Sequence, residues 1–296
     1  MSNWISKGII LAGGSGSRLY PVTQVACKQL LPIYDKPLIY YPLSTLMLYG
    51  IRDILVISSP RDLPLLKSVL GDGHRLGIKL SYAIQEEPKG IAQALTIARD
   101  FLAGQGCALI LGDNIFYGSY DFLRGAQLSE PGATIFAYTV RNPERYGVVT
   151  LDSLGKPVSI VEKPTASKSH LAVTGLYLYD RQAPEIAASL QPSNRGELEI
   201  SDVNQAYLER GQLTVVQLGR GVAWLDTGTP DDMINAGEFI ATIERRQGLK
   251  IGCIEEVAYQ MKFIDAAGLN RIIGELPKSD YRAYLEGVVL SGESSR

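Results

Sequence analysis

The stretch Leu11–Pro21, LAGGSGSRLYP, indicates the class of fold because it joins a short apolar strand to a glycine-rich loop. The strand is Lys7–Ala12, an apolar run of the length of a buried strand. In sheets of alternating strands and helices, ligands bind in the loops that follow the strands. Glycines let backbone amides approach phosphate oxygens, and Arg18 adds a planar cation suited to phosphate. A tight turn that needs glycine only for its dihedral angles explains the same letters equally well, so the loop alone indicates a phosphate-binding candidate.

Three familiar glycine motifs do not match this loop. A P-loop requires Lys-Ser or Lys-Thr after its last glycine, and neither pair follows here. In a dinucleotide fingerprint Leu19 takes the place of the third glycine, and Pro21 disfavours the helix that should begin there. A nucleophile elbow fails because Ser17 stands where its second glycine belongs. His74 and His170 are the two histidines of the chain, so a Ser-His mechanism has few candidates.

Outside the loop, strand-like and helix-like segments alternate, which is typical of a parallel sheet flanked by helices. Up to residue 130 we predict strands at Ile51–Ser58, Ile78–Ile84 and Cys107–Leu111, and helices at Pro37–Tyr49 and Gly90–Ala103. Beyond it we predict closely spaced strands at Ala133–Val140, Gly147–Leu151, Val158–Glu162, Gly175–Tyr179, Leu213–Leu218 and Val222–Leu225, with a helix at Glu197–Arg210. From Pro230 to Gly287 the pattern is largely helical. We therefore expect one nucleotide-binding domain over residues 1–230 and a helical C-terminal subdomain over residues 231–296.

Composition excludes several classes of protein. The apolar content of 46% with 20% charged residues is ordinary for a globular chain, and the formal net charge of −2 argues against nucleic-acid binding. Cys27, Cys107 and Cys253 are widely separated and fit neither a disulfide framework nor a zinc site. No apolar run is long enough to span a membrane, and no targeting segment precedes the first strand. A cytoplasmic location is therefore the expectation.

Nine segments in order identify a family. LAGGSGSRLYP, Lys28 in CKQLLPIYDKPLIYYPLSTLMLYGIRDILVIS, QEEPKGIAQAL, LGDNIFYG, RYGVV, IVEKP, VTGLYLYD, RGELEISDVN and WLDTGTPDDM closely resemble the glucose-1-phosphate thymidylyltransferases. The resemblance covers essentially the whole chain. It implies a Rossmann-like, mostly parallel sheet with a smaller sugar-binding portion and a helical C-terminal subdomain. It also implies that dTTP and α-D-glucose 1-phosphate give dTDP-glucose and pyrophosphate, the first step toward dTDP-L-rhamnose and other deoxysugars.

The resemblance assigns roles to residues whose types suit the chemistry. Asp113 and Asp226 would hold Mg²⁺, which prefers oxygen ligands. Either aspartate alone is better explained as a turn or N-cap residue, and the other motifs reverse that preference. Arg18 and Lys28 would neutralise charge on the departing pyrophosphate. Lys163, with Arg195, would bind the sugar phosphate. The implied nucleotide-binding residues are Leu11, Gly13, Gly14, Ser15, Gly16, Ser17, Gln29, Gln85, Pro88, Gly90 and Asp113. The implied sugar-phosphate-binding residues are Asn114, Tyr146, Gly147, Glu162, Lys163, Val173, Gly175 and Arg195.

Assembly and regulation also follow from the resemblance. It implies a homotetramer and feedback by a dTDP-sugar at a second site, in regions that match Gly118, Gly219, Arg220 and Glu256. Tyr120 lies in a stretch, GSYDF, that departs from the family pattern. One methyl group in a pocket contributes only about 1–3 kcal/mol, so we expect UTP to be accepted less efficiently than dTTP.

Three rival functions remain open. One is a pyrophosphorylase that uses UTP or another nucleotide, or a different sugar such as mannose. A second is a non-catalytic sensor of nucleotide sugars, which the presence of all four charged residues at the expected positions disfavours. The third is an NAD-dependent sugar-nucleotide enzyme, which Leu19 and Pro21 disfavour.

Overall fold

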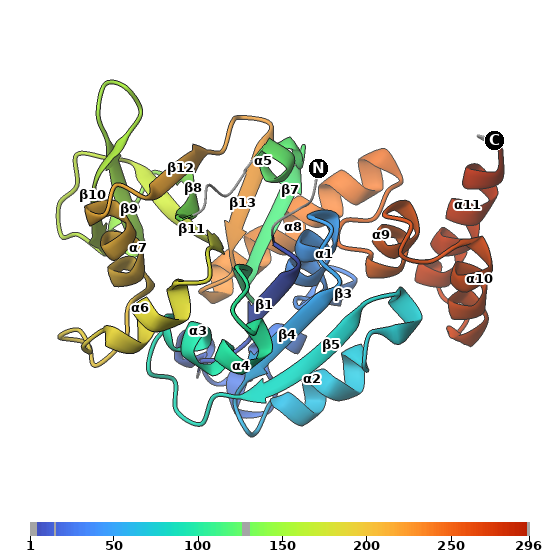
Figure 1. The fold of residues 1–296 in the computed structure, drawn as a ribbon. Coiled ribbons are helices and arrows are strands. Elements are labelled where there is room, and N and C mark those ends of the chain that lie inside the picture. Colours follow the sequence, from blue (N-terminus) through green and yellow to red (C-terminus); the bar gives the residue numbers. More distant parts are fainter. Residues whose placement is uncertain (1–4, 15, 126–130, 295–296) are drawn as a thin grey trace.

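The computed structural model describes residues 5–14, 16–125 and 131–294. The sheet strands are β1 (Lys7–Leu11), β4 (Asp53–Ser58), β5 (Lys79–Ile84), β6 (Cys107–Leu111), β8 (Ala133–Thr139), β9 (Gly147–Leu151), β10 (Pro157–Glu162), β11 (Leu171–Tyr179) and β12 (Leu213–Gln217). They form one sheet in the order β10-β9-β11-β6-β1-β4-β5, in which β8 pairs with β11 and β12 (Figure 1). Strands β6, β1, β4 and β5 are parallel. The predicted fold class is confirmed.

Helices cover both faces of this sheet. They are α1 (Tyr40–Leu48), α2 (Leu63–Leu70), α3 (Gln93–Ile97), α4 (Arg99–Leu102), α5 (Asp121–Gly125), α6 (Ala183–Ser189), α7 (Ile200–Glu209), α8 (Pro230–Gln247), α9 (Ile254–Gln260), α10 (Ala266–Glu275) and α11 (Asp280–Ser294). The strands and helices alternate up to β6 as predicted, and the end of the chain is helical as predicted. The sequence pattern did not predict α2, α5 or α6.

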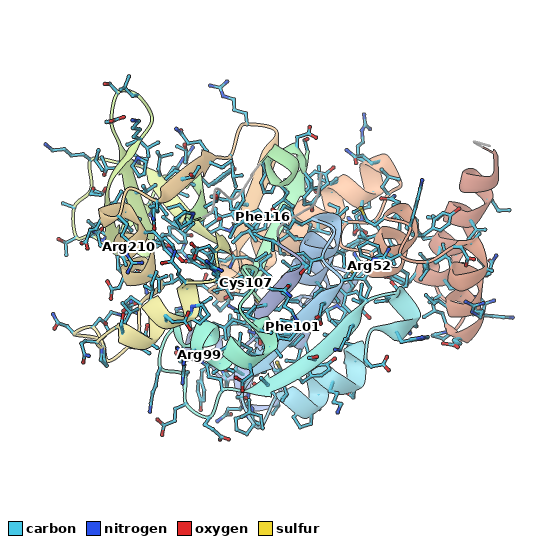
Figure 2. The ribbon with its side chains drawn as sticks, in the orientation of Figure 1. Arg52, Arg99, Phe101, Cys107, Phe116 and Arg210 are labelled. Carbon is cyan, nitrogen blue, oxygen red and sulfur yellow. The ribbon has the colours of Figure 1, made fainter. Side chains whose placement is uncertain are left out.

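Successive residues of β1 supply two different cores. Ile10 is buried among α1 and α9 residues on one face of the sheet. Ile9 and Leu11 are buried on the other face, with α3, α6 and α7. This alternation is the two-residue period of a strand, and burial on both faces is what a parallel sheet requires. In Figure 2, Cys107 of β6 and Phe116 lie in the interior, and both are buried.

Two short antiparallel pairs complete the fold. Strand β2 (Pro32–Ile33) pairs with β3 (Lys36–Pro37), and β7 (Asn114–Gly118) pairs with β13 (Val222–Asp226). Because β3 occupies the first residues of the predicted helix Pro37–Tyr49, α1 begins only at Tyr40. Strand β7 was not predicted, since its partner lies more than a hundred residues away in the sequence.

The predicted helix Gly90–Ala103 is wrong in its extent. The backbone of residues 89–92 pairs instead with Leu198, which donates to the carbonyl of Lys89 (2.7 Å) and accepts from Ala92 (3.1 Å). Helix α3 therefore begins at Gln93, and a break at Ala98 separates it from α4. Smaller corrections of the same kind are that α7 is shorter than Glu197–Arg210 and that β11 is longer than Gly175–Tyr179.

The C-terminal helices differ in how they attach to the sheet. Ala236 and Ile240 of α8 share a core with Leu38 and Tyr41. Helices α10 and α11 instead form a core of their own with Cys253, far from β9 and β10 (Figure 1). The division at residue 230 stays a prediction. Among the described residues, no helix is both long and apolar enough to cross a membrane.

Candidate active site

A cavity of about 260 Å³ lies where β1 and β6 end and faces β9, β10 and β11. Thirteen of the predicted site residues line it, namely Leu11, Gly13, Arg18, Gln29, Asp113, Asn114, Tyr146, Gly147, Glu162, Lys163, Val173, Gly175 and Asp226. These residues come from segments scattered over more than two hundred positions. The fold therefore collects most of the predicted sugar residues and part of the predicted nucleotide set into one cleft, whereas Lys28, Gln85, Pro88, Gly90 and Arg195 do not line it.

The pair β7–β13 brings the two candidate metal ligands together. Its register sets Asp226 opposite Asn114, the residue that follows Asp113. Thr227 fixes the junction by donating its backbone N–H (3.3 Å) and its hydroxyl (2.9 Å) to the carbonyl of Asp113. Burial, followed by the nearby charge of Asp113, raises the pKa of Asp226 to about 6. Two carboxylates that repel each other in a half-buried cleft form a site that a cation would stabilise.

Lys28 and Arg18 lie beside these carboxylates. The Lys28 Nζ is 2.5 Å from Asp113 Oδ2, and its side chain is 10% exposed. A Cβ placed on Gly228 would lie 3.0 Å from both terminal nitrogens of Arg18 and 3.1 Å from Asp226 Oδ2. Arg18 and Asp226 therefore share the space over Gly228, where a larger residue would separate them.

Asn114 connects the carboxylate pair to the sheet. Its amide nitrogen donates to Asp113 Oδ1 (2.9 Å), and its oxygen accepts from the Trp224 indole (2.6 Å) and the Gly175 backbone (3.0 Å). A Cβ on Gly175 would lie 2.6 Å from the Asn114 oxygen, so only glycine permits this approach. The carboxylate of Asp113 is thus held by a fully bonded, buried amide.

The predicted base-recognition segment borders the glycine-rich loop. A Cβ on Gly13 would lie 2.2 Å from Gln85 Oε1, which explains the need for glycine. Gln85 is buried and donates to Gln93 Oε1 (2.8 Å). Gly90 has φ +106°, and a Cβ there would collide with the Leu198 backbone at 2.3 Å. Pro88 is exposed at the same edge.

Other residues of the loop lie just outside the cavity. Among the described residues, Gly14, Gly16 and Ser17 do not line it. Gly16 nevertheless lies close to Lys28, because a Cβ on Gly16 would be 3.8 Å from the Lys28 Cβ. Ser15 lies outside the described residues. A short 3-10 helix over Ser17–Leu19, not a long helix, follows the loop, as the position of Pro21 predicted.

The opposite end of the cavity holds a carboxylate among hydroxyl and cationic groups. Ser201 donates to Glu162 Oε2 at 2.5 Å. Lys163 Nζ and Arg195 Nη1 lie 3.8 and 3.6 Å from Glu162 Oε1. Arg195 also pairs with Glu197 (3.1 Å) and Glu199 (3.4 Å). Lys163 and Arg195 are close to half exposed, so water screens these ion pairs and an incoming anion can compete for the two cations.

Sequence reasoning missed several residues that line the cavity: Ile91, Leu111, Arg145, Tyr177, Ile200, Ser201, Asn204 and Trp224. Most lie inside the motifs quoted above, but nothing local indicates a role for them. Arg145 is an example, because its partner is Asp232 at the start of α8, bonded at 2.5 and 3.4 Å. Trp224 packs on Tyr146, with ring centres 5.1 Å apart.

The four residues proposed for regulation fall into two places. Gly118 ends β7 and pairs with Val222 at the start of β13, and a Cβ on Gly118 would lie 2.0 Å from the carbonyl of Gly221, the residue after Arg220 in the turn before β13. Gly219 belongs to the same turn, whereas Glu256 lies on α9 and accepts from Tyr284 of α11 (2.7 Å). A separate cavity of about 960 Å³ lies between Arg75, Lys262 and Arg271 near α10, and none of the predicted residues lines it.

Comparison with known proteins agrees with this geometry. The nucleotidyl transferase family model matches residues 7–243. A glucose-1-phosphate thymidylyltransferase of Mycolicibacterium smegmatis is 56% identical over 94% of this chain and 97% of its own. One from Xanthomonas campestris pv. campestris (strain B100) is 54% identical over 97% of this chain and 98% of its own.

Solved structures share the fold. A crystal structure of a putative glucose-1-phosphate thymidylyltransferase from Bacillus anthracis, in complex with a sucrose, matches with a TM-score of 0.74 and 40% identity, over 79% of this chain and 94% of that one. A UDP-glucose pyrophosphorylase complexed with UDP-glucose matches with a TM-score of 0.71 at 24% identity, over 82% and 100%, which supports the fold alone. The chain belongs to the nucleotidyl transferase family, among the glucose-1-phosphate thymidylyltransferases.

Proposed function

We propose that this chain joins dTTP to α-D-glucose 1-phosphate, giving dTDP-glucose and pyrophosphate. The observation that carries the proposal is the layout of one cavity, with Asp113, Asp226 and two cations at one end and Glu162 with Lys163 at the other. The names of the relatives supply the substrates. This layout does not support the NAD-dependent alternative. The nearest alternative is a transferase that uses UTP or is specific for mannose 1-phosphate.

The reaction needs two anions to meet in line at the α-phosphorus. An oxygen of the sugar phosphate attacks the α-phosphorus, and the bond to pyrophosphate breaks on the opposite side. The attacking oxygen is already anionic, so the protein needs no nucleophile or general base, and positioning with charge neutralisation carries catalysis. Lys28 and Arg18 would neutralise the departing pyrophosphate, while Lys163 and Arg195 would hold the sugar phosphate.

Asp113 and Asp226 would hold Mg²⁺, which when bound neutralises phosphate charge at the reacting phosphorus. Among the described residues, no group of three or more His, Cys, Asp or Glu side chains could hold a metal ion. Two carboxylates with phosphate oxygens and water are the usual ligands of Mg²⁺ in sites of this kind. The raised pKa of Asp226 supports the assignment, because its causes, burial first and the charge of Asp113 second, are both ones that a bound cation would offset.

Specificity would be divided between the two ends. Gln29 and the loop of Gln85 and Gly90 would face the nucleotide, and Tyr146, Gly147, Val173 and Gly175 would surround the glucose. Glu162, which already accepts from Ser201, would accept sugar hydroxyls with its remaining capacity. UTP would serve less efficiently than dTTP because a single methyl group separates them.

The finer properties implied by the family belong to the same proposal. They are a homotetramer, feedback by a dTDP-sugar near Arg220 and Glu256, a cytoplasmic location and a place at the start of dTDP-L-rhamnose synthesis. Support comes from the resemblance, and from the pair β7–β13, which has Gly118 and Val222 at one end and Asn114 and Asp226 at the other.

The test is pyrophosphate release from dTTP and glucose 1-phosphate, with and without Mg²⁺, in wild type, Asp226→Asn and Asp231→Asn. Asp231 is an exposed aspartate in the first turn of α8 and serves as the matched control. We expect Asp226→Asn to lose about 1,000-fold in kcat and Asp231→Asn to stay within twofold of wild type. A wild type inactive on this substrate pair, or an active Asp226→Asn, would refute the proposal.

A further inference from the structure

Four charged side chains form an ion cluster where the β2–β3 hairpin meets the end of α8, and two of them, Lys36 and Glu244, are buried. Lys36 Nζ lies 2.8 Å from Glu244 Oε1, and the two side chains are 2% and 5% exposed. Lys36 and Lys250 both also pair with Asp35, and Lys250 lies 3.5 Å from Glu244 Oε2. The cluster is electrically neutral, with two cations and two carboxylates. None of its members lines the candidate active site.

Stability alone does not explain this cluster. Burying the charges of Lys36 and Glu244 costs free energy that their mutual attraction only partly recovers, and apolar residues of similar size often stabilise as well or better. Glu244 Oε1 also accepts the Ile251 backbone N–H (2.8 Å), whereas the buried Oε2 has no hydrogen-bond partner and lies 3.5 Å from Lys250. Unlike an apolar contact, paired charges fix one geometry, so the cluster sets the position of the element to which it is attached.

That element is the short helix that carries two proposed nucleotide residues. The 3-10 helix Lys28–Leu30 leads directly into β2, and the strand after the hairpin returns beside it. Ile39 N donates to the Gln29 carbonyl (2.9 Å), and Leu38 N donates to the Leu31 carbonyl (3.0 Å). A shift of the hairpin would therefore move Gln29, and with it the Lys28 ammonium beside Asp113.

The other side of the cluster is attached to the C-terminal helices. Lys250 Nζ lies 5.7 Å from the ring centres of both Tyr281 and Tyr284 on α11. Tyr281 donates to Glu255 (2.6 Å) and Tyr284 to Glu256 (2.7 Å), both on α9. Figure 1 shows α8, α9 and α11 following one another outward from the sheet. The cluster thus lies between these helices and the Lys28 segment.

We propose that Lys36 is a positioning residue for Lys28 and Gln29, and that its ion pair with Glu244 anchors their segment on the C-terminal helices. The inference rests on the proposed role of Lys28 and Gln29 in holding the nucleotide. Because Glu162, Lys163 and Arg195 lie on other elements, the anchor serves the nucleotide and not the sugar phosphate. Loss of the ion pair between Lys36 and Glu244 should therefore weaken the binding of dTTP and not that of glucose 1-phosphate.

The test uses a charge-neutral pair of substitutions, Lys36→Met with Glu244→Gln. Gln keeps an acceptor for the Ile251 N–H, and Asp35 keeps Lys250 as its partner. Steady-state kinetics and calorimetric binding of dTTP with Mg²⁺ are measured beside thermal unfolding. We expect kcat to fall about 10-fold and the KM and Kd for dTTP to rise about 10-fold, while the KM for glucose 1-phosphate stays within twofold.

The matched control is Lys7→Met with Asp53→Asn, which removes another partly buried ion pair (2.9 Å) at the far ends of β1 and β4. This control should lower the unfolding temperature without changing the KM for dTTP or the KM for glucose 1-phosphate. If the double variant of Lys36 and Glu244 does not fold, Lys250→Met at the more exposed edge of the cluster replaces it. This variant should raise the KM for dTTP about 3-fold and leave the KM for glucose 1-phosphate unchanged. Lys28→Met is run in the same assay to separate the inference from the proposed function.

The outcomes distinguish the possibilities. A folded Lys36 and Glu244 variant with both KM values unchanged, or with both raised equally, would overturn the positioning role. If that happens while Lys28→Met is impaired in using dTTP, the positioning role of Lys36 is wrong but the proposed function is still supported. If Lys28→Met binds and uses dTTP normally, the proposed role of Lys28 is wrong, and the inference fails with it.

Discussion

The two ends of the cavity hold their charges in different ways. At the nucleotide end, Lys28 is 10% exposed and bonded to Asp113, whose carboxylate is also bonded to a buried amide. At the sugar end, Lys163 and Arg195 are 45% and 43% exposed and lie at least 3.6 Å from Glu162. The first set is preorganised where charge must develop, and the second can adjust to its ligand. We therefore expect damage to the first to lower kcat and damage to the second to raise KM.

Among changes that leave the charged residues of the cavity in place, the largest effect should come from Asn114→Ala. This change leaves the Gly175 N–H and the Trp224 indole without their acceptor and releases the Asp113 carboxylate. A misplacement of the metal ligand by a fraction of an ångström should lower kcat about 100-fold with little change in the KM for glucose 1-phosphate. Steady-state kinetics at saturating Mg²⁺ measure it, and an unchanged kcat would mean that the amide does not hold the site.

A second prediction concerns the free energy stored at the nucleotide end. Burial and the charge of Asp113 raise the pKa of Asp226 from 3.8 to about 6. Between about pH 4 and pH 6 the unfolded chain has released this proton and the folded protein has not, so stability falls as pH rises through that window. Without metal, the free energy of unfolding of Asp226→Asn should therefore be about 3 kcal/mol higher than that of wild type at pH 8, with almost no difference at pH 4.

Urea unfolding in a chelator at several pH values checks this, with Asp231→Asn as the exposed control. The difference between Asp226→Asn and wild type should grow with pH, while Asp231→Asn should match wild type throughout. If Asp226→Asn raises the free energy of unfolding by the same amount at every pH, the charge of Asp226 is not the cause of the difference.

The smallest effect should come from the sugar end. Ser201→Ala removes one hydrogen bond to Glu162. Because the carboxylate is partly exposed and water can replace the hydroxyl, we expect the KM for glucose 1-phosphate to rise about 3- to 10-fold and kcat to stay within twofold. A loss of kcat comparable to that of Asn114→Ala would erase the distinction between the two ends.

Local patterns in the sequence predict the central sheet well. The apolar runs around β1 and β6 are continuous because both faces of these strands are buried, so length and composition suffice to find them. The same reasoning places the glycine-rich loop and Asp113 at strand ends, and the structure confirms both positions.

What local patterns cannot predict are pairings between distant segments. Strand β7 exists because of β13, and α3 begins late because Leu198 pairs with residues 89–92. Arg145 acquires its partner, Asp232, only through the fold. For the site, the family motifs supplied residue roles that periodicity alone left open, such as those of Lys28 and Lys163.

The most direct test of the account compares Lys28→Met with Lys163→Met in one set of kinetic assays. Both substitutions remove an ammonium group, Lys28 from beside Asp113 and Lys163 from beside Glu162. We predict that Lys28→Met lowers kcat about 100- to 1,000-fold, whereas Lys163→Met raises the KM for glucose 1-phosphate more than about 10-fold and lowers kcat less than about 10-fold. Equal losses of kcat in both variants, or the reverse pattern, would contradict the division of the cavity into a preorganised end and an adjustable one.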